Sequence, residues 1–126
     1  MENKNQNLLQ GIDTVIIRVS DIENSKNWYQ TKLRLASIWE DPKTKLVVLD
    51  SKGPTSLTLW QANKKITVDK ETGSYPIFKT PDAAMLRKEI QNNGVEVGEL
   101  IHDDIVIYFF FFDPDGNILE ACQVHD

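Results

Sequence analysis

Residues 108–121 read YFFFFDPDGNILEA, and this stretch decides the fold. It begins with five consecutive aromatic residues, which is typical of a strand covered on both faces. Pro114 and Gly116 supply the fixed φ and the positive φ of a tight turn. A second strand follows over 117–124, and Glu120 is its only carboxylate. An unpaired aromatic run would favour aggregation, but the turn and the polar flanks indicate the central strand of a covered hairpin.

The hairpin ends a series of strand and helix patterns that occurs twice along the chain. The first series predicts strand, helix and three strands over 14–21, 22–33, 35–41, 45–51 and 56–62. The second predicts the same order over 75–82, 82–94, 95–101, 105–112 and 117–124. Ser20 or Asp21 is expected to cap the first helix, Asp82 to cap the second, and Gly94 to end it.

Equal spacings indicate that the two halves are copies of one pattern. Thr14 precedes Asp21 by seven residues, and Tyr75 precedes Asp82 by seven. Thr14 and Tyr75 are themselves 61 residues apart. A repeat of this length predicts an α+β fold built from two βαβββ modules.

The length of the chain suits one domain with a hydrophobic core. The polar, Asn- and Gln-rich residues 1–10 predict a mobile tail, and residues 11–126 a single domain. Within that domain we expect one module over 11–62, a polar linker over 63–73 and a second module over 74–124.

Composition excludes several functional classes. A net charge of −5 argues against sequence-independent binding of nucleic acid, which needs clustered Lys and Arg. The sequence shows neither a signal-peptide pattern nor an apolar run long enough for a transmembrane helix, so no membrane partner is expected. A single cysteine, Cys122, excludes an intramolecular disulfide and suits a reducing compartment. Together these features predict a cytoplasmic protein.

Two motifs resemble those of a known superfamily. TVIIRVSDIENSKNWYQTKLRL (14–35) is similar to the opening strand and helix, and FFFFDPDGNILEA (109–121) to the closing hairpin, of the vicinal oxygen chelate superfamily. This superfamily includes glyoxalase I, bleomycin resistance proteins and extradiol dioxygenases. The resemblance covers residues 11–124 and implies a curved mixed sheet around a cup, with the helices outside. It also implies a homodimer, whose modules pair either within one chain or between two.

Members that use a metal hold it in the cup with four ligands. The resemblance places those positions at Thr14, Thr58, Tyr75 and Glu120, and only Glu120 is a usual ligand. Catalytic metal sites generally need at least three protein ligands. We therefore expect no cofactor, and a divalent metal only if Glu120 holds it with unusual partners. His102, in a predicted turn, and His125, near the end of the chain, are expected to be exposed surface residues.

Strand alternation supports the assignment of the cup. Thr14 and Arg18 share one face of their strand, opposite apolar residues that suit packing under a helix. The same reading applies to the other strands that carry the four positions. The predicted ligand-binding residues are Thr14, Arg18, Trp39, Thr58, Trp60, Tyr75 and Glu120. Aromatic walls with a few polar groups describe a pocket for a small aromatic or cationic molecule.

Several roles remain open for these residues. Glu120 either forms an ion pair with Arg18, binds an amine of a ligand, or acts as a general base with a raised pKa. The tryptophans serve equally well as core or dimer-interface residues, and Cys122 as a small core residue or a reactive thiol.

The function predicted from these features is metal-free binding of a small molecule, similar to the drug-sequestering resistance proteins. The alternative is a metal-dependent lyase, isomerase or dioxygenase of the same superfamily that uses Glu120. A third class is an interaction module whose cup is filled by its own aromatic side chains.

Overall fold

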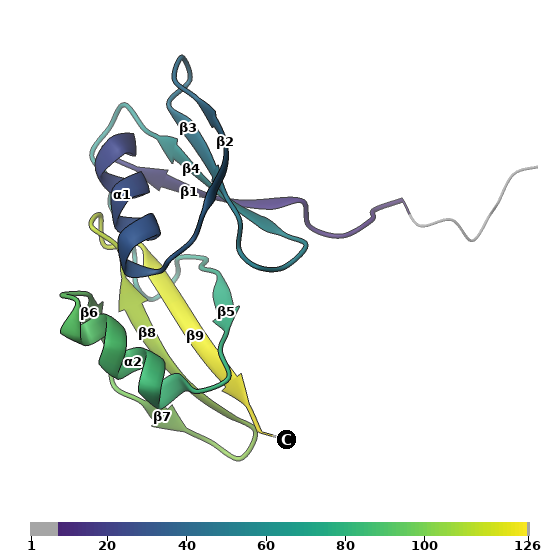
Figure 1. The fold of residues 1–126 in the computed structure, drawn as a ribbon, viewed down its shortest axis with the longest axis vertical. Coiled ribbons are helices and arrows are strands. Elements are labelled where there is room, and N and C mark those ends of the chain that lie inside the picture. Colours follow the sequence, from purple (N-terminus) through teal and green to yellow (C-terminus); the bar gives the residue numbers. More distant parts are fainter. Residues whose placement is uncertain (1–7, 126) are drawn as a thin grey trace, which may run out of the picture.

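The computed structural model of the protein describes residues 8–125, which form two modules shown one above the other in Figure 1. The first module consists of β1 (Thr14–Val19), α1 (Ile22–Lys32), β2 (Ser37–Asp41), β3 (Leu46–Leu49) and β4 (Ser56–Gln61). The second consists of β5 (Ile77–Lys79), α2 (Ala83–Asn92), β6 (Glu96–Val97), β7 (Ile101–His102), β8 (Val106–Phe112) and β9 (Ile118–Val124). The predicted α+β fold is confirmed. Most of the predicted tail, residues 1–7, lies outside the described residues.

Each module forms its own mixed sheet. The first sheet has the order β1-β4-β3-β2, in which β1 and β4 are parallel. The second has the order β5-β9-β8-β6, with β5 parallel to β9 and β7 paired to β8. The two sheets therefore repeat one topology, as the spacing of the sequence patterns predicts. Neither helix in residues 8–125 is long and apolar enough to cross a bilayer.

The helix ends follow the predicted signals. Asp21 accepts a hydrogen bond from the backbone N–H of Asn24, so Asp21 rather than Ser20 caps α1. Asp82 accepts the corresponding bond from Met85 at the start of α2. Gly94 follows α2 with a φ of +89°, a conformation that glycine adopts without steric cost.

Three details of the second module differ from the sequence prediction. The strand expected over 95–101 is split into β6 and β7, because Gly98 approaches β8 closely and its N–H donates to the Phe110 carbonyl. A Cβ at Gly98 would lie 3.4 Å from that oxygen. The strand expected from residue 75 begins only at Ile77, after a proline that lacks an N–H. His102 lies in β7 rather than in a turn, although it is exposed as expected.

The core lies between each sheet and its helix. Val19, Leu49 and Leu59 are fully buried on the face of the first sheet that α1 covers. In β8, Phe109 and Phe111 are buried on the face that α2 covers. The intervening aromatic residues of the run are only half-buried. The prediction of a strand covered on both faces is therefore wrong for the single chain, because within residues 8–125 a helix covers only one of its faces.

The turn between β8 and β9 joins the two modules. The Tyr29 hydroxyl of α1 donates to a carboxylate oxygen of Asp113 at 2.7 Å, and both side chains are buried. The Asn117 side chain donates to the Arg18 carbonyl at 2.9 Å, and the Ser20 N–H donates to Asp115 at 3.0 Å. Burial raises the pKa of the Asp113 carboxyl, although hydrogen bonds from Asn117 and Tyr29 oppose that shift. The turn predicted from the sequence thus also fixes the position of one module on the other.

Candidate functional site

Five predicted binding residues lie on one face of the first sheet, the face opposite α1. Strand register pairs Arg18 with Trp60 and Ile16 with Thr58, and it aligns Trp39 with Thr58 through Val48 of β3. Residues that are paired across strands point to the same side of a sheet. We call this surface the first open face, and it comprises Thr14, Ile16, Arg18, Trp39, Thr58 and Trp60.

A pair of threonines occupies the two metal-ligand positions of the first open face. The hydroxyl oxygens of Thr14 and Thr58 are 2.7 Å apart. The Thr14 hydroxyl also lies within hydrogen-bond distance of the Ser56 carbonyl, at 3.2 Å, and either threonine can donate within the pair. Thr58 is only 4% exposed. These two neutral hydroxyls satisfy each other and leave no charge at this end of the site.

The Arg18 side chain is held on the first sheet. Its guanidinium carbon lies 4.2 Å from the centre of the Trp60 ring, in cation–π contact. Its Nε and Nη2 atoms donate to the carbonyls of Trp60 and Gln61 at 3.2 and 3.3 Å. Among the described residues Arg18 forms no ion pair with Glu120. The hypothesis that these two residues neutralise each other is therefore wrong for the single chain.

Glu120 lies on the second sheet, between Ile77 of β5 and Phe110 of β8. As a residue it is 6% exposed, and its carboxylate has no hydrogen bond or ion pair within residues 8–125. Its carboxylate oxygens keep contact with solvent, since no fully buried side-chain oxygen in these residues lacks a hydrogen-bond partner. Burial raises the pKa of this carboxyl, and no neighbouring positive charge opposes the shift. Burial also raises the pKa of the nearby Cys122 thiol, as do the charges of Glu120 and Asp103. A thiol with a raised pKa is a poor nucleophile, so Cys122 has no activated character here.

Aromatic rings surround Glu120 on this second open face, which comprises Tyr75, Ile77, Tyr108, Phe110, Ile118, Glu120 and Cys122. The Tyr75 ring meets the Phe110 ring edge-on, with centroids 5.5 Å apart. Tyr108 meets Phe110 in the same way at 6.0 Å. Tyr108 and Phe110 were missed as site residues. Alternation along the aromatic run shows which residues share a face, but it does not show that this face carries Glu120, since that depends on strand register.

The Thr14–Thr58 pair and Glu120 do not line a common pocket within residues 8–125. No hydrogen bond, ion pair or ring contact in the described residues joins the Thr14–Thr58 pair to Glu120. A cavity of about 600 Å³ does lie between β1 and the segment that follows β4, and Arg18 and Tyr75 line it. Neither Glu120 nor Thr58 lines this cavity. The structure thus places the predicted residues on two surfaces, which meet at this cavity through Arg18 of the first and Tyr75 of the second.

The residues at the four metal-ligand positions do not fit a catalytic divalent metal. They offer one carboxylate, one phenol and two hydroxyls that are hydrogen-bonded to each other. Within residues 8–125 no three His, Cys, Asp or Glu side chains are grouped to hold a metal ion. His102 and His125 are both exposed. A site of this composition lacks the three charged or imidazole donors that such metals require.

Comparison with known protein families identifies the superfamily to which this fold belongs. The sequence profile of the Glyoxalase/Bleomycin resistance protein/Dioxygenase superfamily matches residues 11–121. The chain therefore belongs to this superfamily, and the resemblance carried by its first and last motifs is confirmed. No curated protein matches the sequence with significance.

Solved structures share the fold at low sequence identity. The protein SMU.1112c is 26% identical, with a TM-score of 0.77 over 90% of this chain and 98% of its own. A glyoxylase/bleomycin resistance protein/dioxygenase domain from Frankia sp. EAN1pec is 19% identical, with a TM-score of 0.78 over 93% and 99%. TnmS3, an antibiotic binding protein from Streptomyces sp. CB03234, is 20% identical, with a TM-score of 0.76 over 95% and 100%. At these identities the likeness establishes the fold.

Proposed function

We propose that this chain is a small-molecule binding protein that works without a metal and sequesters an aromatic, cationic compound. The observation that carries the proposal is Glu120, whose carboxylate has no protein partner in the described residues, is open to solvent at its oxygens and lies beside aromatic rings. Partial desolvation disfavours its charge, and a cation that binds it would compensate for the lost solvation.

The surroundings of Glu120 suit the two parts of such a ligand. An ammonium group would donate a charge-assisted hydrogen bond to the carboxylate. The aromatic body would lie against the rings of Tyr75 and Phe110, which meet edge-on and present a wide apolar surface. The donor set at the four metal positions favours this reading over the metal-dependent enzymes of the superfamily. The antibiotic binding protein among the structural neighbours is a precedent for such a role on this fold.

We further propose that the protein is a cytoplasmic homodimer whose second copy covers the open faces. Ile16 is 51% exposed and Trp39 is 56% exposed on the first open face, and Ile77 is 57% exposed on the second. Apolar side chains gathered on one surface usually mark an interface. A partner copy that brings a second open face opposite the first would complete a cup around both sets of predicted residues. A single cysteine suits a reducing compartment.

Calorimetry with a matched pair of probes tests the role of Glu120. The pair 4-phenylbutylamine and 4-phenylbutanol differ in charge and share an apolar body. We expect the amine to bind at least about tenfold more tightly, since a hydrogen bond to a charged group is worth about 1.5–3 kcal/mol. Glu120→Gln should abolish this preference, whereas Glu99→Gln, at an exposed glutamate of the same module, should preserve it. Equal binding of amine and alcohol to the unaltered protein would contradict the proposal.

Native mass spectrometry of the untagged protein tests the absence of metal and the dimer. We expect a metal-free dimer that takes up one amine for each chain. About one zinc, iron, manganese or nickel ion per chain, lost in Glu120→Gln, would instead favour the metal-dependent lyase, isomerase or dioxygenase. A monomer that still binds the amine would contradict only the proposed assembly.

A further inference from the structure

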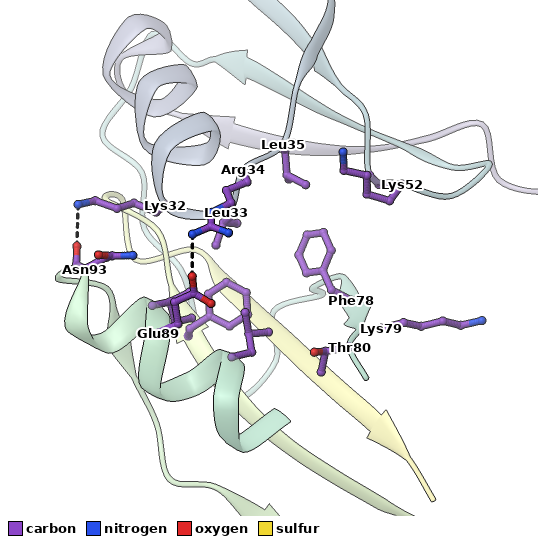
Figure 2. Close-up of a pocket in the computed structure, with 14 residues that line it drawn as sticks. Lys32, Leu33, Arg34, Leu35, Lys52, Phe78, Lys79, Thr80, Glu89 and Asn93 are labelled. Atoms are coloured by element: carbon purple, nitrogen blue, oxygen red, sulfur yellow. Dashed lines mark hydrogen bonds and ion pairs between the residues drawn. The ribbon is translucent and has the colours of Figure 1, made fainter. Parts of the chain in front are cut away.

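A second cavity lies on the helix side of the sheets, away from both open faces. Its volume is about 460 Å³, and it is bounded by the end of α1 and the turn after β3 on one side, and by β5 and α2 on the other. Figure 2 shows Leu35 and Lys52 of the first module facing Phe78 and Thr80 of the second across this gap. The register of β5 and β8 places Phe78 and Phe111 on the sheet face opposite Glu120. The cavity is therefore distinct from the proposed binding site.

The walls of this intermodule cavity are apolar. Six hydrophobic side chains line it, two of them from the first module and four from the second: Leu33, Leu35, Phe78, Leu86, Ile90 and Phe111. Small-molecule pockets typically have volumes of roughly 300–1,000 Å³ and are lined mostly by such residues. The volume and the lining thus suit an organic molecule better than ordered water, which needs polar partners.

The rim of the same cavity is positively charged. Its cationic residues are Lys32, Arg34, Lys52 and Lys79, and its only carboxylate is Glu89. Arg34 pairs with Glu89 at 2.7 Å, and the Lys32 ammonium donates to the Asn93 carbonyl at 2.6 Å (Figure 2). Within residues 8–125 neither Lys52 nor Lys79 has a carboxylate at ion-pair distance. The local excess of positive charge is opposite in sign to the net charge of −5 of the chain.

From this juxtaposition we propose that the intermodule cavity binds a small amphipathic anion, a carboxylate carried on an apolar body. The body fills the space between Leu35, Phe78 and Leu86, and the carboxylate lies at the rim near Lys52. The cationic rim attracts an anion, whereas the rest of the surface, which is acidic overall, repels it. The site takes a ligand of opposite charge to that proposed for Glu120, so neither proposal depends on the other.

Calorimetry with decanoate and 2-naphthoate tests the site and distinguishes an alkyl body from an aryl one. We expect at least one of them to bind, and its uncharged amide, decanamide or 2-naphthamide, to bind at least tenfold more weakly. Lys52→Glu should weaken binding of the acid at least tenfold. Lys45→Glu is its matched control, because Lys45 is also an exposed turn lysine with a positive φ in the first module, 57° against 75° for Lys52. Lys45 does not line this cavity.

A second pair of variants tests the place of binding by volume rather than charge. Leu86→Trp should fill the cavity and reduce the affinity at least tenfold, whereas Met85→Trp adds the same ring at a neighbouring α2 position that is 62% exposed and should have no effect. The proposal is overturned if neither acid binds at millimolar concentration, or if acid and amide bind equally. Equal losses in Lys52→Glu and Lys45→Glu, or unchanged affinity in Leu86→Trp, would overturn it as well.

Discussion

The two modules bury equivalent faces but differ in the chemistry of the faces that they leave open. In the first module the two ligand positions are Thr14 and Thr58, which are neutral and hydrogen-bonded to each other. In the second module the corresponding position on β9 carries a carboxylate, Glu120, whose oxygens are open to solvent and have no protein partner in the described residues. A repeated fold therefore preserves its packing while the two halves of the site diverge. The hydroxyls of the first module are hydrogen-bonded to each other, whereas the carboxylate of the second has no protein partner in the described residues.

The largest effects are expected where the modules are alike. Leu59 and Phe109 are both fully buried under the helix of their own module. Leu59→Ala should cost about 2–5 kcal/mol and Phe109→Ala about 3–5 kcal/mol of unfolding free energy, through lost burial and the cavity left behind. Urea denaturation followed by circular dichroism would measure both. If either variant unfolded in two separate steps, the modules would be independent folding units, and the two substitutions would not report on one shared core.

A smaller effect is expected where the modules meet. Tyr29→Phe removes the hydrogen bond to the buried Asp113 carboxylate and should cost about 2 kcal/mol. Tyr108→Phe is the matched control, since the Tyr108 hydroxyl has no hydrogen bond within residues 8–125, and it should change stability by less than about 0.5 kcal/mol. Equal losses in the two variants would show that the Tyr29–Asp113 contact does not hold the modules together.

Substitutions at Thr58 and Glu120 are expected to change the stability of the protein in opposite directions. Thr58→Val removes the hydrogen bond between the two threonines, leaving Thr14 only the Ser56 carbonyl, and should destabilise the protein by about 1 kcal/mol. Glu120→Gln removes a partly desolvated charge without a protein partner and should stabilise the chain by up to about 1 kcal/mol at pH 7, because solvent still screens the carboxylate. Thermal unfolding of both variants measures the difference. If Glu120→Gln were destabilising, Glu120 would have a structural partner and the contrast between the modules would disappear.

The smallest effect is the dependence of stability on pH that Glu120 of the second module contributes. Burial raises the pKa of Glu120 in the folded chain above its ordinary value of 4.5. The neutral acid is therefore favoured by folding, and this contribution to stability is present below the unfolded pKa and lost as pH rises through the folded pKa. The melting temperatures of the natural chain and Glu120→Gln should converge near pH 4 and separate toward pH 7. A constant difference across that range would contradict the raised pKa.

Much of the fold could be predicted because it depends on local patterns. The caps at Asp21 and Asp82, the positive φ at Gly94 and the repeated order of elements all follow from short stretches of sequence. The split of one predicted strand at Gly98 could not be foreseen, because it results from the close approach of Gly98 to β8. Local sequence patterns do not show which strand lies beside this segment.

The candidate site was predicted less completely for a similar reason. Alternation places residues on one face of a strand, and five of the seven predicted residues do share the first open face. Alternation does not set the register between strands, so it missed the contact of Phe110 with Tyr75 beside Glu120. Nor does alternation define how the two sheets are placed relative to each other. The ion pair of Arg18 with Glu120 was therefore predicted wrongly, since Arg18 contacts Trp60 and Gln61 of its own sheet.

The turn between β8 and β9 also has a consequence for how the protein is made. Its contacts with the first module join residues that are far apart in sequence, by 84 positions for Tyr29 and Asp113 and by 99 for Arg18 and Asn117. During synthesis the strands of the first module emerge from the ribosome well before this turn, so the first module can fold before its anchor exists. The nascent chain therefore carries the first sheet without this anchor while residues 62–112 are made. We expect docking of the two modules to be among the last steps of folding, because contacts between such distant residues form slowly.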